Sequence, residues 1–133
     1  METGKVRFGY AHFAFLGEES LWSAAATECA AEQDQFWAYH DLLFEKGEIQ
    51  GAYSKENLKQ YAIDMNLDSE QFDECLDSGR AEAIVEQDNN FARQLGVGST
   101  PTFSLNGRAV QGALPFENFQ GMIEEELAKA GAE

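Results

Sequence analysis

The spacing of hydrophobic positions changes along the chain, and each change predicts a different kind of element. Residues 6–10 alternate apolar with other side chains, which is typical of a half-buried strand, and the pattern continues weakly to Phe15 before Gly17 interrupts it. Apolar residues then recur every three or four positions, as in amphipathic helices. Five helical segments are predicted: 21–33, 36–46, 55–65, a short fourth helix that bears Phe72, Cys75 and Leu76, and 81–95.

Polar residues and glycines mark where these helices should begin and end. The predicted N-terminal caps are Ser20, Asp34, Ser54, and either Asp68 or Ser69. The predicted stops are Asn66, Gly79 and Gly96. The second helix, 36–46, is apolar almost all round, so we expect it to be largely buried.

After residue 95 the spacing of apolar residues changes from the three or four positions of a helix to the alternation of a strand. Residues 102–105 and 108–111 predict two short strands joined by Asn106 and Gly107, because Asn-Gly is a strong signal for a tight hairpin turn. Pro115 suits the first turn of a last amphipathic helix that ends near Gly131. A strand, five helices, a hairpin and a helix indicate an α/β or α+β fold with a small sheet.

The composition is that of one globular domain of 133 residues, spanning 1–133. Its 24 acidic residues against 9 basic ones give a net charge of -15, which disfavours nucleic acid as a partner. No apolar run is long enough for a membrane span, and no signal peptide is evident. The polar residues 2–5 indicate either a native start or an artificial start inside a longer protein.

The chain has two cysteines, Cys29 and Cys75, which lie 46 positions apart, and it has no C-x-x-C. A zinc finger, an iron–sulfur site and a self-contained redox dithiol are therefore excluded within these residues. Each cysteine falls on the apolar face of its helix, where a buried thiol can act as a small hydrophobic side chain. His12 and His40 fit no metal-ligand spacing, and we expect neither metal nor cofactor, with His40 a hydrogen-bonded core or boundary residue.

Residues 96–103, Gly-Val-Gly-Ser-Thr-Pro-Thr-Phe, precede the hairpin, a glycine and the closing helix. This order resembles the C-terminal half of a thioredoxin fold. The helical region resembles the insertion of the DsbA-like branch in Glu28-Cys29-Ala30, Gln33, the aromatic stretch 36–44 and residues 72–76. The resemblance implies an α/β thioredoxin-like fold with a helical insertion at 20–95. Residues 96–133 would form a cis-proline loop, the hairpin and the C-terminal helix.

The resemblance also implies a function and its residues. DsbA-like proteins are thiol-disulfide oxidoreductases of oxidising, extracytoplasmic compartments, and their partners are cysteine-containing proteins. By match, Ser99, Thr100 and Pro101 would form the substrate-binding loop, and Cys29 and Cys75 would form a structural disulfide, with two buried free thiols as the alternative. In that family a strand and a C-x-x-C helix precede the strand matched by residues 6–10, and both are lacking here.

This departure leads to three expectations. We expect a chain truncated before its C-x-x-C segment, with a natural protein that dispensed with the motif as the alternative. We expect it to be redox-inactive, because disulfide exchange needs a reactive thiolate and a resolving thiol. We also expect a homodimer formed through exposed strand edges, although edge closure or a segment supplied in trans is an alternative. The alternative functions are a non-catalytic binding or assembly domain and a glutathione-transferase-like isomerase.

Overall fold

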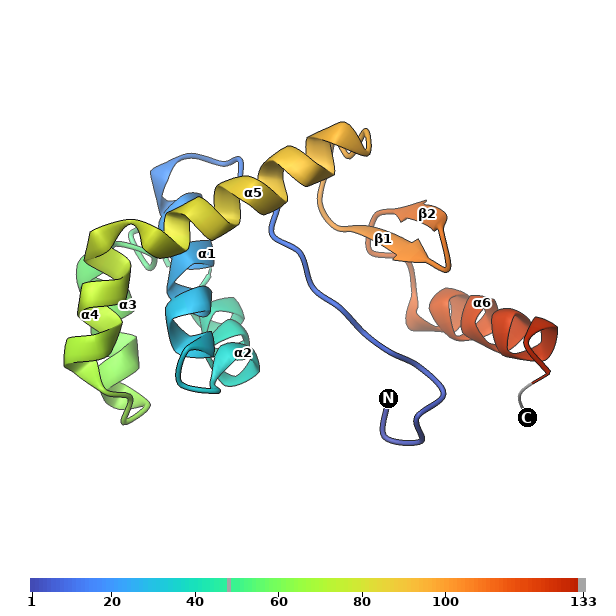
Figure 1. The fold of residues 1–133 in the computed structure, drawn as a ribbon, viewed down its shortest axis with the longest axis horizontal. Coiled ribbons are helices and arrows are strands. Elements are labelled where there is room, and N and C mark those ends of the chain that lie inside the picture. Colours follow the sequence, from blue (N-terminus) through green and yellow to red (C-terminus); the bar gives the residue numbers. More distant parts are fainter. Residues whose placement is uncertain (48, 132–133) are drawn as a thin grey trace. The chain divides into compact units, whose positions relative to one another are not determined.

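A computed structural model describes residues 1–47 and 49–131, and these form two compact units (Figure 1). One unit comprises residues 12–92 and is helical. The other combines residues 1–11 with the chain from residue 93 onward. The elements in chain order are α1 (Glu18–Ala31), α2 (Phe36–Lys46), α3 (Lys55–Asp64), α4 (Ser69–Ser78), α5 (Arg80–Gln94), β1 (Thr102–Leu105), β2 (Arg108–Gln111) and α6 (Phe116–Lys129).

The helical unit is built around α1, which packs against α2, α3 and α4. Its inward face carries small side chains, including the fully buried Ala25, Ala26 and Ala30, so neighbouring helices can approach closely. Larger side chains from the other helices fill the remaining space, namely Tyr39, Leu43, Leu58, Phe72, Leu76 and Val85. Tyr39 is fully buried, and its hydroxyl donates to the Leu58 carbonyl at 2.8 Å.

Several helix boundaries confirm the predictions made from capping residues. The Ser54 side chain accepts from the Asn57 N–H at 3.2 Å, and the Asp68 side chain accepts from the Gln71 N–H at 3.0 Å. Helix α4 ends at Gly79, whose φ of 80° lies in the left-handed region that favours glycine. These boundaries were predictable because each cap is a contact within one turn of the chain.

Other local predictions were wrong. Helix α1 begins at Glu18 after Gly17, so Ser20 lies inside the helix and does not cap it. Asp34 breaks the chain with a φ of 60°, but Gln35 is the N-cap of α2. Pro115 likewise precedes α6 as its N-cap instead of occupying the first turn.

The prediction that α2 is largely buried was also wrong. Only Tyr39 and Leu43 of this helix are buried, whereas Phe44 is 73% exposed. An apolar pattern around a whole helix does not supply neighbours for every side. Among the described helices, α1 makes the main packing contact with α2, so one face of α2 is covered by that contact.

The predicted strand at residues 6–10 is not a strand in the structure. Within residues 1–47 and 49–131 the sheet consists of β1 and β2 alone, paired antiparallel with Phe103 opposite Val110. A strand requires a neighbouring ladder, and the alternating pattern by itself provides none. The hairpin prediction is confirmed, since Asn106 and Gly107 both have positive φ, at 50° and 87°.

Helix α6 packs on the hairpin within its unit. The Phe103 and Phe119 rings lie 4.6 Å apart between centroids, a spacing typical of favourable aromatic pairs. Asn106 in the turn also donates to Glu126 at 3.1 Å. Strand β1, which follows the Ser99–Pro101 segment directly, is thereby fixed against the last helix.

Candidate functional site

Ser99, Thr100 and Pro101 form a short exposed loop between α5 and β1. The peptide bond between Thr100 and Pro101 is cis. Gly96, with a φ of 79°, ends the preceding helix and turns the chain toward the loop. The three residues predicted as a substrate loop are therefore contiguous at the surface, at the start of the hairpin.

Two hydrogen bonds anchor this loop to the hairpin. The Thr102 hydroxyl donates to the Ser99 carbonyl at 2.7 Å, and the Gly112 N–H donates to the Pro101 carbonyl at 2.8 Å. Gly112 has a φ of 89°, a conformation that disfavours any larger side chain. Between the two anchors, Thr100 makes no hydrogen bond to any described residue. Its N–H and carbonyl are therefore open to an external partner.

Cys29 and Cys75 form a disulfide that joins α1 to α4, with their Cα atoms 5.7 Å apart. Cys29 is fully buried and Cys75 is 1% exposed. Both cysteines of the chain are therefore held inside the helical core, out of reach of a substrate protein. A cross-link between residues 46 positions apart mainly restricts the unfolded chain.

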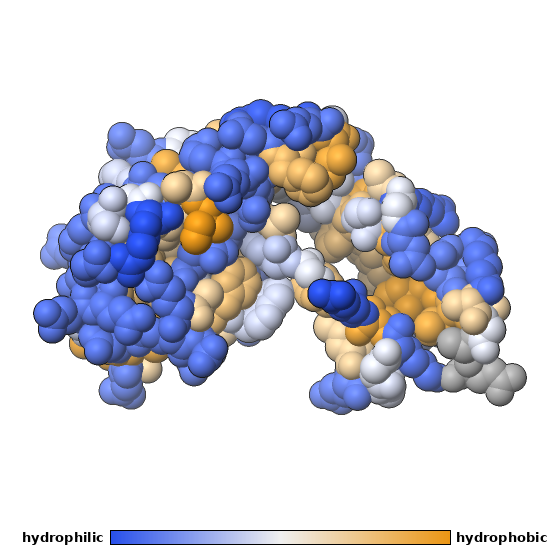
Figure 2. All heavy atoms as spheres, in the orientation of Figure 1, coloured by the Kyte–Doolittle hydropathy of each residue, from blue (hydrophilic) through white to orange (hydrophobic). Residues whose placement is uncertain are grey.

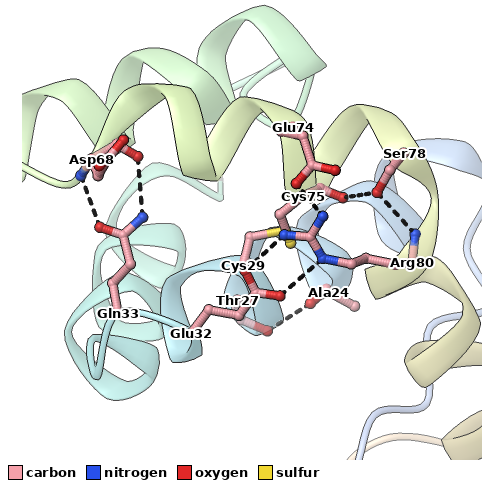
Figure 3. Close-up of a disulfide and its surroundings, with 10 residues drawn as sticks. All are labelled: Ala24, Thr27, Cys29, Glu32, Gln33, Asp68, Glu74, Cys75, Ser78 and Arg80. Atoms are coloured by element: carbon pink, nitrogen blue, oxygen red, sulfur yellow. Dashed lines mark hydrogen bonds and ion pairs between the residues drawn. A yellow bond between two sulfur atoms is a disulfide. The ribbon is translucent and has the colours of Figure 1, made fainter.

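Arg80, at the start of α5, joins three helices beside this disulfide (Figure 3). Its Nε and one terminal nitrogen donate to the two Glu32 oxygens at 3.0 and 2.9 Å, and its other terminal nitrogen pairs with Glu74. The hydrogen bond from Arg80 lowers the pKa of the Glu32 carboxyl, and partial desolvation opposes this shift. Arg80 thus connects the end of α1 to α4 with a charge-assisted, two-pronged contact.

A second polar cluster holds the segment before α1. His12 is 3% exposed, and its Nε2 lies 2.7 Å from Glu28 while its main-chain N–H donates to Asp88 at 2.9 Å. Asn89 bonds to both main-chain groups of Ala14. This cluster was not predictable from the sequence, because its members are up to 76 positions apart and no local motif links them.

His40 lies at the boundary of the core, as predicted. Its side chain is 19% exposed, its Nδ1 lies 3.0 Å from Asp41, and its ring lies beside Trp37 and Phe44. Neither histidine joins a metal-binding group: within the described part of the chain, no three His, Cys, Asp or Glu side chains are grouped to hold an ion.

The surface of the protein is not uniformly polar. In Figure 2 apolar side chains reach the surface near the end of α5 and around the hairpin and α6. Leu95 is 66% exposed and Phe116 is 71% exposed. No helix in the described residues is long and apolar enough to cross a bilayer.

Several known proteins are similar in sequence to this chain. Disulfide bond formation protein D of Bacillus subtilis (strain 168) is 26% identical over 143 residues, which cover 96% of this chain and 60% of that protein. "Probable disulfide bond formation protein D" of Bacillus anthracis is 29% identical over 135 residues, or 97% of this chain and 61% of that protein. The Na(+)/H(+) antiporter NhaA of Herminiimonas arsenicoxydans is 35% identical over 102 residues, or 77% of this chain and 16% of that protein. The chain thus spans less than two thirds of each relative.

No solved structure matches the chain. A protein-family model described as Thioredoxin matches residues 1–125. That range includes the helical unit, the Ser99–Pro101 loop and most of α6, so the match does not depend on one motif. The DsbA-like resemblance and the thioredoxin-like fold class are confirmed, and the chain belongs to the thioredoxin family.

Proposed function

We propose that this chain supplies the substrate-recognition part of a DsbA-like protein disulfide oxidoreductase. The observation that carries the proposal is the exposed Thr100 backbone, held between two anchored residues at the start of β1. An extended peptide can form main-chain hydrogen bonds to such a group, as in other cases of recognition by strand addition. The partners are cysteine-containing segments of other proteins, encountered in an extracytoplasmic compartment.

The same proposal makes these 133 residues redox-inactive by themselves. Thiol-disulfide exchange begins when a thiolate attacks one sulfur of a substrate disulfide, and a second thiol then resolves the mixed disulfide. The sequence contains no C-x-x-C, and its two cysteines are bonded to each other inside the core. The chain has no accessible thiolate to begin the reaction, and Cys29–Cys75 serves as a structural cross-link.

Two measurements on the same preparation test these two statements. In an insulin-reduction assay with dithiothreitol, we expect the rate with the protein to equal the rate of the buffer control. In fluorescence anisotropy, a labelled unstructured peptide with a central S-methylcysteine should bind saturably. A matched peptide with N-methylated amides on both sides of that residue should bind more weakly, because it lacks main-chain donors. A rate well above the control, or no saturable binding, would refute the corresponding statement.

We further propose that the chain associates, most simply as a symmetric homodimer. Strand β1 pairs with β2 along one edge, and β2 is its only strand partner within residues 1–47 and 49–131. A strand edge and exposed apolar side chains such as Leu95 and Phe116 favour pairing between copies. Light scattering should give a dimer mass at micromolar concentration. A monodisperse monomer would contradict this.

A second candidate is a non-catalytic binding or assembly domain. The chain is 35% identical to a segment of a protein named Na(+)/H(+) antiporter NhaA. Similar segments therefore occur in proteins whose names do not refer to disulfide formation, and this favours the second candidate. The two candidates differ in what the bound peptide must contain. Recognition for disulfide exchange predicts tighter binding of the S-methylcysteine peptide than of an alanine analogue, whereas an assembly domain should bind the two peptides equally.

A further inference from the structure

The Thr102 side chain makes a hydrogen bond to the preceding loop, which a threonine in a strand does not need to make. Its hydroxyl turns back three residues and donates to the Ser99 carbonyl at 2.7 Å. Thr102 is half-buried, and the neighbouring strand position of like size, Ser104, is exposed and makes no side-chain hydrogen bond within the described chain. The hydroxyl of Thr102 therefore acts on the loop, not on the sheet.

The hydrogen bonds around Thr100 divide the loop into fixed and open groups. The carbonyl before Thr100 is occupied by Thr102, and the carbonyl after it is occupied by the Gly112 N–H. Each of these carbonyls already accepts one internal hydrogen bond, so it is a weaker competitor for an incoming donor than a carbonyl with no bond. Thr100 alone of these three loop residues keeps both main-chain groups available among the residues that the structure describes.

We propose that Thr102 is a positioning residue for peptide recognition, fixing the orientation of the Thr100 main chain through the Ser99 carbonyl. This inference rests on the proposed function of the loop. When the Ser99 carbonyl is held, the Ser99–Thr100 peptide group cannot rotate freely, and less conformational entropy is lost when a peptide binds. Without the hydroxyl, Ser99 rotates and its carbonyl offers a competing acceptor.

Two substitutions at this position separate positioning from strand structure. Thr102→Val keeps the shape and the β-branching but removes the donor, whereas Thr102→Ser keeps the donor and removes the methyl group. Ser104→Ala is the matched control on the same strand. Because Thr102→Val loses one hydrogen bond, we expect it to bind the S-methylcysteine peptide about 3- to 10-fold more weakly than the natural chain. The affinities of Thr102→Ser and Ser104→Ala should lie within about 2-fold of that of the natural chain.

A second readout does not depend on binding. In ¹⁵N relaxation of the free protein, the Thr100 amide of Thr102→Val should show a lower order parameter than in the natural chain, while the amides of β2 remain unchanged. Equal peptide affinity and equal Thr100 order in the two proteins would overturn the inference. A loss with Thr102→Ser as large as with Thr102→Val would also overturn it.

If the natural chain fails to bind the peptide, the proposed function fails first, and the relaxation measurement then shows whether Thr102 still orders the loop. Binding by the natural chain with no change in Thr102→Val leaves the proposed function intact and refutes only the positioning role. The two failures are therefore distinguishable.

Discussion

Asn89 holds both main-chain groups of Ala14. The Ala14 N–H donates to Asn89 Oδ1 at 2.8 Å, and Asn89 Nδ2 donates to the Ala14 carbonyl at 3.0 Å. A carboxamide presents one acceptor and one donor with the spacing of a peptide group, so it can substitute for a neighbouring strand. The chain before α1 is thus fixed by a side chain of α5, not by a sheet.

A second carboxamide does the same at the edge of the helical unit. Gln33 accepts from the Asp68 N–H at 2.8 Å and donates to the Asp68 carbonyl at 3.1 Å (Figure 3). Asp68 is also the N-cap of α4. Irregular backbone next to helix ends therefore forms hydrogen bonds with side chains from distant parts of the sequence, part-buried at Ala14 and exposed at Asp68.

Replacing Asn89 should destabilise the helical unit. Asn89 is 1% exposed, and Asn89→Ala leaves the two main-chain groups of Ala14 without partners. Each buried unsatisfied group costs about 1–3 kcal/mol, and because the two groups of Ala14 are only part-buried, we expect a total loss in the lower part of the range for two groups, about 2–4 kcal/mol in the free energy of unfolding. Urea denaturation measures the loss. Gln87→Ala, at an exposed position of the same helix, is the control and should change the value by less than about 0.5 kcal/mol.

Removing the disulfide should lower stability without changing the loop. Cys29→Ala combined with Cys75→Ala opens a cross-link of 46 positions, for which chain entropy predicts a loss of about 3–4 kcal/mol. Either single substitution should cost a similar amount, because each one breaks the same bond. A thiol titration of the denatured natural chain without reductant should detect no free thiol. Two free thiols would show that the cross-link is absent in solution.

The contact between Arg80 and Glu32 should make stability depend on pH in the acid range. Arg80 lowers the pKa of Glu32 below its ordinary value of 4.5, so the folded state binds this proton less readily than the unfolded state. The stabilisation is fully present above pH 4.5 and is lost as the pH falls through the lowered pKa of the folded state. Arg80→Gln removes the cause of the shift.

The difference in unfolding free energy between the natural chain and Arg80→Gln should therefore be constant from about pH 7 to 5 and should shrink below about pH 4. Chemical denaturation at several pH values measures it, and Glu32→Gln should show the same dependence. A difference that stays constant down to pH 3 would mean that Glu32 and Arg80 do not interact in solution.

The elements that the sequence predicted well are those defined by nearby residues. Helices α3 and α4 follow from Ser54 and Asp68 and the apolar spacing behind them, and the hairpin follows from Asn106 and Gly107. The segment at residues 6–10 was predicted wrongly because a strand depends on a neighbour, which local pattern cannot supply.

The residues of the candidate site likewise include some that could be predicted from the sequence and some that could not. Ser99, Thr100 and Pro101 were predicted through the resemblance of residues 96–103, and the disulfide was an expectation from the same source. The partners of Ala14 and His12 were not predicted, since Asn89 lies 75 positions from Ala14 and only tertiary packing brings them together. The Thr102 hydroxyl was also missed, because a threonine in a strand ordinarily needs no further role.

The central claim is that the Ser99–Pro101 loop binds an extended cysteine-containing segment. The most direct measurement is an NMR titration of the ¹⁵N-labelled chain with the S-methylcysteine peptide. The account predicts saturable shifts centred on the amides of Ser99, Thr100 and Thr102, which the N-methylated peptide weakens. Shifts confined to α1–α4, or no saturable shift at all, would contradict it.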